Sequence, residues 1–121
     1  ETIGTMITRH GEEIFRNTVD MMREAPVILM VLEGVEAVEI VRKMNGKTEP
    51  KSSAPGTIRG DYAHMSYAHA DGNGMALNNI IHASGDQAEA AREIAHWFAE
   101  TELFSYQSIH DLSAQRLKGS K

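Results

Sequence analysis

The hydrophobic positions in the first third of the chain follow two different patterns. In Glu12–Arg23 the apolar residues Phe15, Val19 and Met22 are spaced at i, i+4 and i+7, which predicts a helix with one buried face. Pro26 ends this pattern, because the residue before a proline is disfavoured in the helical conformation. The next stretch, Val27–Leu32, is continuously apolar, and its length is typical of a strand buried on both faces.

The middle of the chain has a second helical pattern followed by residues that favour turns. A helix is predicted over Val35–Met44, with Gly46 as its end. The segment Thr48–Gly60 is rich in turn-forming residues, so it is expected to be mostly a surface loop that can meet a ligand. A short strand is predicted at Arg59–Tyr62. Ala63–Leu77 has no clear period and is interpreted as an excursion from the core.

The last third of the chain predicts one more helix and a polar tail. Ser84 is expected to be its N-cap, with Gln87 completing a capping box. The helix carries one apolar face, formed by Ala88, Ala91, Ile94 and Phe98. Residues 1–112 are expected to form one domain and residues 113–121 a flexible tail. The order of strands and helices indicates an α/β or α+β layered fold.

Composition narrows the class of protein. The 121 residues suffice for one domain at most, and the net charge of −5 favours neither a DNA-binding surface nor a basic membrane-binding face. No cysteine is present, which excludes disulfides and thiolate metal sites and fits a reducing compartment. The longest apolar run, Pro26–Leu32, is too short to cross a bilayer, and no signal peptide is visible.

Several stretches of the sequence resemble one enzyme family. The stretch "NIIHAS", followed by a helix that carries Glu93, resembles the active-site signature of nucleoside diphosphate kinases. The stretches "APVILMVLEG", "VRKMNGKTEP", "APGTIRGDY" and "WFAETELFSY" resemble further blocks of that family and occur in the same order, from about Ile14 to Tyr106. The resemblance implies an α+β ferredoxin-like sandwich, in which helices back a four-stranded antiparallel sheet.

The resemblance also implies an activity and its residues. Such enzymes transfer the γ-phosphate of a nucleoside triphosphate to a nucleoside diphosphate by a ping-pong mechanism, here through phosphorylated His82. Glu93 and Ser84 match the groups that support the histidine. The positions that match the phosphate- and sugar-binding residues are Arg42, Thr48, Arg59 and Asn79.

The base contact, the cofactor and the assembly are likewise implied by the resemblance. Counting back from Pro26 without gaps places Ile14 at the family's base-stacking aromatic, with Phe15 next to it, and the assignment stays open between them. Mg²⁺ would be held through the nucleotide phosphates, not by a cage of protein ligands. The expected partners are nucleoside di- and triphosphates and further copies of the chain, as a hexamer or tetramer in the cytoplasm. No membrane and no sequence-specific nucleic acid are expected.

The chemistry of these residue types is consistent with phosphoryl transfer. A neutral imidazole keeps a free lone pair and is a good phosphate acceptor, while Glu93 or the nearer Ser84 could hold the other ring nitrogen. The sequence leaves open which nitrogen attacks. Arginines from two separate segments would supply bidentate donors to phosphate oxygens. His64, His69 and Asp71 have no metal-ligand spacing and are interpreted as exposed loop residues.

The chain departs from the family pattern at its start. No stretch matches the family's opening strand with its Lys-Pro-Asp segment, so the phosphate-binding lysine has no counterpart, and the natural chain is expected to be longer at the N-terminus. The excursion at 63–77 is longer than in many relatives. One alternative is a catalytically impaired nucleotide-binding or assembly module of the same fold. Another is a histidine phosphotransfer domain, which the strand-like Val27–Leu32 and the loop Glu49–Gly60 disfavour.

Overall fold

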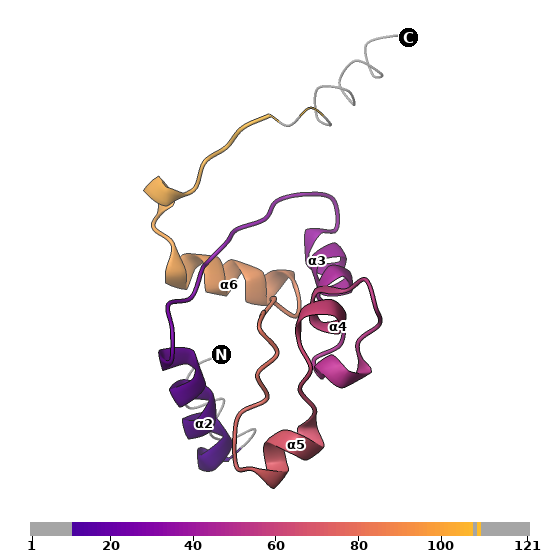
Figure 1. Ribbon diagram of the computed structural model, residues 1–121. Helices are drawn as coiled ribbons and strands as arrows, with labels where there is room; N and C mark the ends of the chain where they lie inside the picture. Colours follow the sequence, from indigo (N-terminus) through magenta and orange to yellow (C-terminus); the bar gives the residue numbers. More distant parts are fainter. Residues whose placement is uncertain (1–10, 108, 110–121) are drawn as a thin grey trace.

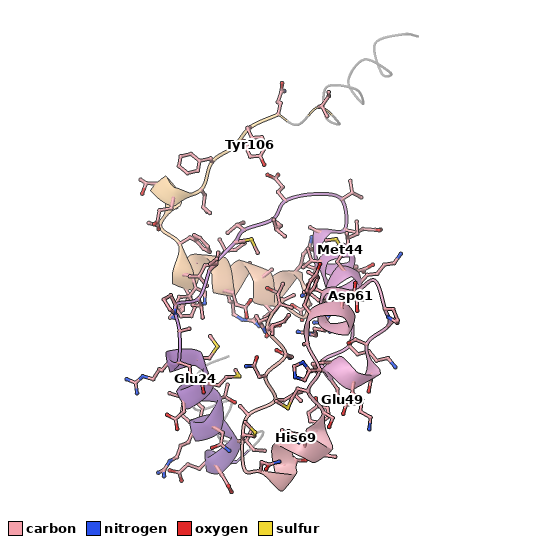
Figure 2. All side chains as sticks on the ribbon, viewed as in Figure 1. Glu24, Met44, Glu49, Asp61, His69 and Tyr106 are labelled. Atoms are coloured by element: carbon pink, nitrogen blue, oxygen red, sulfur yellow. The ribbon has the colours of Figure 1, made fainter. Side chains whose placement is uncertain are left out.

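The computed structural model describes residues 11–107 and 109 and consists of helices joined by extended segments (Figure 1). The elements are α2 (Glu12–Arg23), α3 (Ala37–Asn45), the 3-10 turn η1 (Pro50–Ser52), α4 (Ile58–Tyr62), α5 (Tyr67–Gly72), α6 (Gln87–Trp97) and the 3-10 turn η2 (Glu100–Glu102). Figure 1 shows α3 and α4 next to each other, with the chain between α5 and α6 passing beside α4. Figure 2 shows Tyr106 on the C-terminal segment, away from the helices.

The first two predicted helices are confirmed, because their signals are local. Helix α2 has the predicted bounds. Helix α3 begins two residues later than predicted, since Glu36 adopts a left-handed conformation with φ 51° and serves as the N-cap. It ends at Gly46, whose φ of 85° is readily accessible only to glycine.

The strand predicted at Val27–Leu32 does not form within the described part of the chain. The segment is extended, but it has no ladder with any neighbour, and its side chains are exposed, from 39% at Val31 to 86% at Ile28. A strand needs the N–H and C=O groups of a second extended segment, and residues 11–107 place none beside it. The expected four-stranded sheet is therefore not confirmed.

The short strand predicted at Arg59–Tyr62 is wrong, because these residues belong to helix α4. Thr57 is the N-cap of α4, and its hydroxyl accepts a hydrogen bond from the Gly60 amide at 3.1 Å. This local cap satisfies one of the free donors of the first turn and favours a helix. The predicted loop Thr48–Gly60 is accordingly a loop only in part, since it also contains η1 and the start of α4.

The excursion Ala63–Leu77 is tied to the rest of the structure. It contains the short helix α5. The amide of Lys51 in η1 donates to the carbonyl of Met65 at 3.0 Å, and Nδ2 of Asn17 in α2 donates to the carbonyl of Gly74, also at 3.0 Å. Both ends of the excursion are therefore attached to neighbouring elements.

The N-cap predicted for the last helix is wrong by two residues. Asp86 caps α6, and its carboxylate accepts a hydrogen bond from the Glu89 amide at 2.7 Å. Asp is an N-cap residue as good as Ser, and Asp86 directly precedes the first residue of the helix. Ser84 is thus free for a different contact, described below. The predicted tail 113–121 and the domain boundary at 112 lie outside the described residues.

Few side chains are buried in the described part of the chain, and they lie where α3, η1, α4 and α5 meet. They are Asn45, Pro50, Arg59 and Ala70. Asn45 is 2% exposed, and neither polar atom of its side chain has a hydrogen-bond partner among the described residues.

Within residues 11–107 and 109, no helix has both the length and the apolar character needed to cross a membrane.

Candidate active site

His82 lies in the extended segment that leads into α6, and its side chain is 73% exposed. Its Nε2 is 3.1 Å from Oε1 of Glu93, which comes from the middle of α6. A carboxylate can only accept, so Nε2 carries the proton and donates it to Glu93. Nδ1 has no hydrogen-bond partner within residues 11–107 and keeps its lone pair.

Glu93 also accepts a hydrogen bond from Ser84, whose Oγ is 2.6 Å from Oε2. Partial burial raises the pKa of Glu93, but the hydrogen bonds from Ser84 and His82 outweigh burial and lower the pKa below its ordinary value. Glu93 is therefore a carboxylate at neutral pH. The predicted set His82, Ser84 and Glu93 is brought together, with Glu93 in the centre.

Arg59 is buried beside this set, with 8% exposure. Its Nη1 donates to the carbonyls of Gly46 at 3.1 Å and Lys47 at 3.2 Å. Its Nε donates to the carbonyl of Asn79 at 3.4 Å, and its Nη2 donates to the carbonyl of Ile81. Arg59 therefore links the turn after α3 to the segment that carries the histidine.

The other predicted phosphate-binding residues surround Arg59. Burial lowers the pKa of Arg59, and the positive charge of Arg42, which is close enough to act on it, lowers the pKa further. Arg42 itself is exposed in the last turn of α3. Thr48 lies in the turn that follows, and its carbonyl accepts a hydrogen bond from Nδ2 of Asn79 at 3.2 Å. The four predicted residues thus belong to one region.

The predicted base contacts lie on α2, where Ile14 is exposed and Phe15 is half-buried. Neither lines the cavity of about 230 Å³ that α2 forms with the facing segments of the chain. The walls of this cavity include Asn17 and Met21 from α2, and Met65, Met75 and Asn78 from the other side. Sequence reasoning missed these residues. Asn17 and Met21 stand one and two turns after Ile14 on the same helix, and this spacing could have indicated that they face the same side as the predicted base contact.

Glu49 is another residue that sequence reasoning missed. Its carboxylate accepts hydrogen bonds from the hydroxyl of Ser52 and from the amide of Tyr67 at 3.0 Å. These bonds lower the pKa of Glu49 and attach α5 to the turn that follows Thr48 (Figure 2). No sequence signal could have revealed the contact, because Tyr67 takes part only through its backbone.

Metal-ligating side chains do not gather in this region. Within the residues that the structure describes, no group of three or more His, Cys, Asp or Glu side chains could hold a metal ion. His64, His69 and Asp71 are exposed.

Comparison with known proteins decides the family. The family model described as nucleoside diphosphate kinase matches residues 7–103. The chain belongs to the nucleoside diphosphate kinase family. The nucleoside diphosphate kinase of Borreliella burgdorferi is 42% identical over 101 residues, which are 84% of this chain and 60% of that protein. That of Pyrobaculum aerophilum is 48% identical over 93 residues, which are 77% of this chain and 51% of that protein.

Solved structures of nucleoside diphosphate kinases share this fold. A transition-state mimic of the Borrelia burgdorferi enzyme with bound vanadate and ADP aligns with a TM-score of 0.84 and 38% identity, covering 91% of this chain and 66% of that one. The Halobacterium salinarum enzyme in complex with CDP aligns with a TM-score of 0.72 and 32% identity, covering 93% and 67%. The chain spans between half and two thirds of the length of the curated relatives named above.

Proposed function

We propose that the protein acts as a nucleoside diphosphate kinase, which transfers the γ-phosphate of a nucleoside triphosphate to a nucleoside diphosphate through phosphorylated His82. The observation that carries this proposal is the exposed imidazole of His82, with Nε2 bonded to Glu93 and Nδ1 free. The sequence left the choice of nitrogen open, and this contact favours Nδ1 as the nucleophile.

The transfer proceeds in two half-reactions. The lone pair of Nδ1 attacks the γ-phosphorus, an N–P bond forms, and the bond to the β-phosphate oxygen breaks with its electrons leaving on the nucleoside diphosphate. The ring then carries a positive charge, because Nε2 keeps its proton, and the Glu93 carboxylate stabilises this charge at 3.1 Å. A second nucleoside diphosphate attacks the phosphorus, and the lone pair returns to Nδ1.

The phosphates are held mainly by Arg42, Thr48 and the charge of Arg59. Arg42 is exposed and offers the planar fork that fits phosphate oxygens. Two guanidinium groups in one neighbourhood concentrate positive potential in a protein whose net charge is −5. Asn79 contacts the sugar and phosphate region. Mg²⁺ would be held by the oxygens of the nucleotide phosphates, where it would offset their negative charge.

The nucleoside is proposed to lie against α2. Ile14 or Phe15 lies over the base, one turn before Asn17 and the cavity of about 230 Å³. Support for nucleotide partners comes from relatives, since the Borrelia burgdorferi structure holds ADP and the Halobacterium salinarum structure holds CDP.

The protein is proposed to be a cytoplasmic homo-oligomer, a hexamer or tetramer. The exposed apolar segment Val27–Leu32 supports an assembly, because side chains of this kind are stabilised by burial against further protein.

A catalytically impaired nucleotide-binding or assembly module is the second candidate. One observation favours it: Val27–Leu32 lacks paired strands in the described part of the chain. Such a module binds nucleotide but forms no phosphohistidine.

The decisive experiment is intact-mass analysis before and after addition of ATP and Mg²⁺. We expect one acid-labile phosphoryl group on the protein, which is lost when a nucleoside diphosphate is added. His82→Ala abolishes the gain, whereas His96→Ala retains it, because His96 contacts Trp97 at the far end of α6. Acid-labile phosphate on the His82→Ala protein would refute the mechanism, and binding of ADP without any phosphorylation of the unmodified protein would favour the second candidate.

A further inference from the structure

We infer that Asn73, at the end of α5, is a site of spontaneous deamidation to aspartate and isoaspartate, and that this modification loosens the contact between the excursion and α2. The effect on nucleotide binding rests on the proposed function, whereas the modification itself does not. Two asparagines in the chain, Asn45 and Asn73, directly precede a glycine. The structure gives these two asparagines opposite surroundings, and this difference selects Asn73.

The reaction needs only the protein and water. The backbone nitrogen of the following glycine attacks Cγ of the asparagine while its proton passes to water or hydroxide, so a new C–N bond forms. The bond between Cγ and Nδ2 breaks and ammonia leaves, which produces a succinimide ring. Water then opens either carbonyl of the ring and gives aspartate or isoaspartate. A glycine favours the attack, because it has no Cβ to obstruct the approach of its nitrogen.

Asn73 is exposed, and the backbone around it has room to rotate. Its ψ of 5° must change before the nitrogen of Gly74 can reach Cγ. Gly72 and Gly74 flank it, and a Cβ on either glycine would meet no atom within 4 Å. The amide of Gly74 donates to the carbonyl of Asp71 at 3.3 Å, a long bond at the end of a six-residue helix. Nδ2 of Asn73 donates to the carbonyl of His69 at 2.7 Å, but this bond involves the group that leaves and does not block Cγ.

Asn45 has the same sequence neighbour without the same freedom. It is the last residue of α3 and is 2% exposed. The amide of Gly46 donates to the carbonyl of Arg42 at 3.1 Å, and a Cβ on Gly46 would lie 2.7 Å from Oγ1 of Thr57. Deamidation at Asn45 therefore requires local unfolding that admits water. It would also leave a carboxylate where the described residues offer the present amide no hydrogen-bond partner.

Deamidation at Asn73 acts on the contact with α2. The carbonyl of Gly74 accepts a hydrogen bond from Nδ2 of Asn17 at 3.0 Å, where the chain that leaves α5 passes beside α2 (Figure 1). Isoaspartate adds one carbon to the main chain just before Gly74, so this carbonyl is displaced from Asn17. Both products also add a negative charge next to a cavity that the carboxylates of Asp20 and Glu24 already line. The contact is weakened by the displacement and by the added repulsion.

The site is tested by peptide mapping with mass spectrometry on the unmodified protein, kept at mildly alkaline pH with and without urea. In the folded protein, Asn73 should deamidate at least about 10-fold faster than Asn45, because a local opening that costs about 1.4 kcal/mol already slows a reaction by that factor. In urea the two rates should agree within about threefold, since both asparagines precede glycine. Enzymatic methylation of isoaspartate should label the peptide that contains Asn73.

Two results would overturn this assignment. One is a folded protein in which Asn45 deamidates as fast as Asn73. The other is an Asn73 that deamidates more than about 10-fold more slowly in the folded protein than in urea, because α5 and its hydrogen bonds would then protect it.

The consequence for binding is tested against the matched variant Asn73→Gln, whose longer side chain closes a ring far more slowly. After equal incubation, the dissociation constant of the unmodified protein for ADP should rise by about three- to tenfold in the deamidated fraction, while Asn73→Gln keeps its initial value. Asn73→Asp carries the charge without the added main-chain carbon and should show a smaller rise. An unchanged affinity after full conversion would refute the loosened contact. A protein that binds no ADP at all refutes the proposed function, while the peptide maps still decide the site.

Discussion

The contact between Glu93 and His82 makes a quantitative prediction for Glu93→Gln. The substitution keeps the size of the side chain but removes its charge, so a phosphorylated imidazole would lose its carboxylate partner at 3.1 Å. Glutamine also replaces one acceptor oxygen with an NH2 donor, so the side chain can no longer accept hydrogen bonds from both His82 at 3.1 Å and Ser84 at 2.6 Å. The expected effect falls on the phosphoryl-transfer step, because the charge on the ring develops there.

The magnitude follows from the environment of the pair. A hydrogen bond to a charged group contributes about 1.5–3 kcal/mol. The low end applies here, since the side chain of His82 is 73% exposed and water screens the interaction. A loss of about 1.4 kcal/mol corresponds to a tenfold lower rate, so Glu93→Gln should slow phosphohistidine formation about tenfold. Ser84→Ala removes the hydrogen bond that orients this carboxylate and acts on the imidazole only through Glu93. It should therefore slow phosphohistidine formation less, by about fivefold, which corresponds to about 1 kcal/mol.

The assay is rapid-quench measurement of phosphohistidine at saturating ATP and Mg²⁺. The matched control is Glu89→Gln, one turn earlier on α6, where the carboxylate accepts from the amide of Gly85 and does not contact His82. This control should retain the unmodified rate. If Glu93→Gln stays within about twofold of that control, the carboxylate does not support the imidazole and the reasoning is refuted.

Three further predictions concern stability, each measured by urea unfolding. The pKa of Glu93 is lowered in the folded state, so the ionised carboxylate stabilises the fold fully above its unfolded pKa near 4.5, and this stabilisation is lost as the pH falls through the lower folded pKa. The difference in unfolding free energy between the unmodified protein and Glu93→Gln should therefore shrink below pH 4.5. A difference that stays constant with pH would contradict this prediction. Asn45→Leu should stabilise the protein by about 1–3 kcal/mol, since it removes a buried amide without partners, and a loss of stability would reveal a partner that the described residues do not include. Gly60→Ala should destabilise the protein by about 1–3 kcal/mol, because the new Cβ would clash with the backbone carbonyl of Ala54. The control Gly72→Ala should not destabilise it, because its Cβ would meet no atom within 4 Å.

Local signals in the sequence were sufficient for part of this protein. The bounds of α2 and the glycine that ends α3 follow from the spacing of apolar residues and from a backbone conformation that only glycine adopts readily. Such signals act within a few residues, so no knowledge of the fold is needed to interpret them. The stretch "NIIHAS", through its resemblance to the kinase family, predicts His82 as the nucleophile, and the helix predicted after it is present as α6.

Pairings between distant segments were decided only by the tertiary structure. Val27–Leu32 is apolar enough for a strand, but a strand requires a second segment alongside, and the described residues provide none. Ser84 was a plausible helix cap until the fold brought Glu93 within 2.6 Å of its hydroxyl. Arg59 was expected to bind phosphate, and the sequence did not predict its hydrogen bonds to carbonyls in two remote segments. Every residue offers the same backbone acceptor, so only the folded structure determines which carbonyls meet a given side chain.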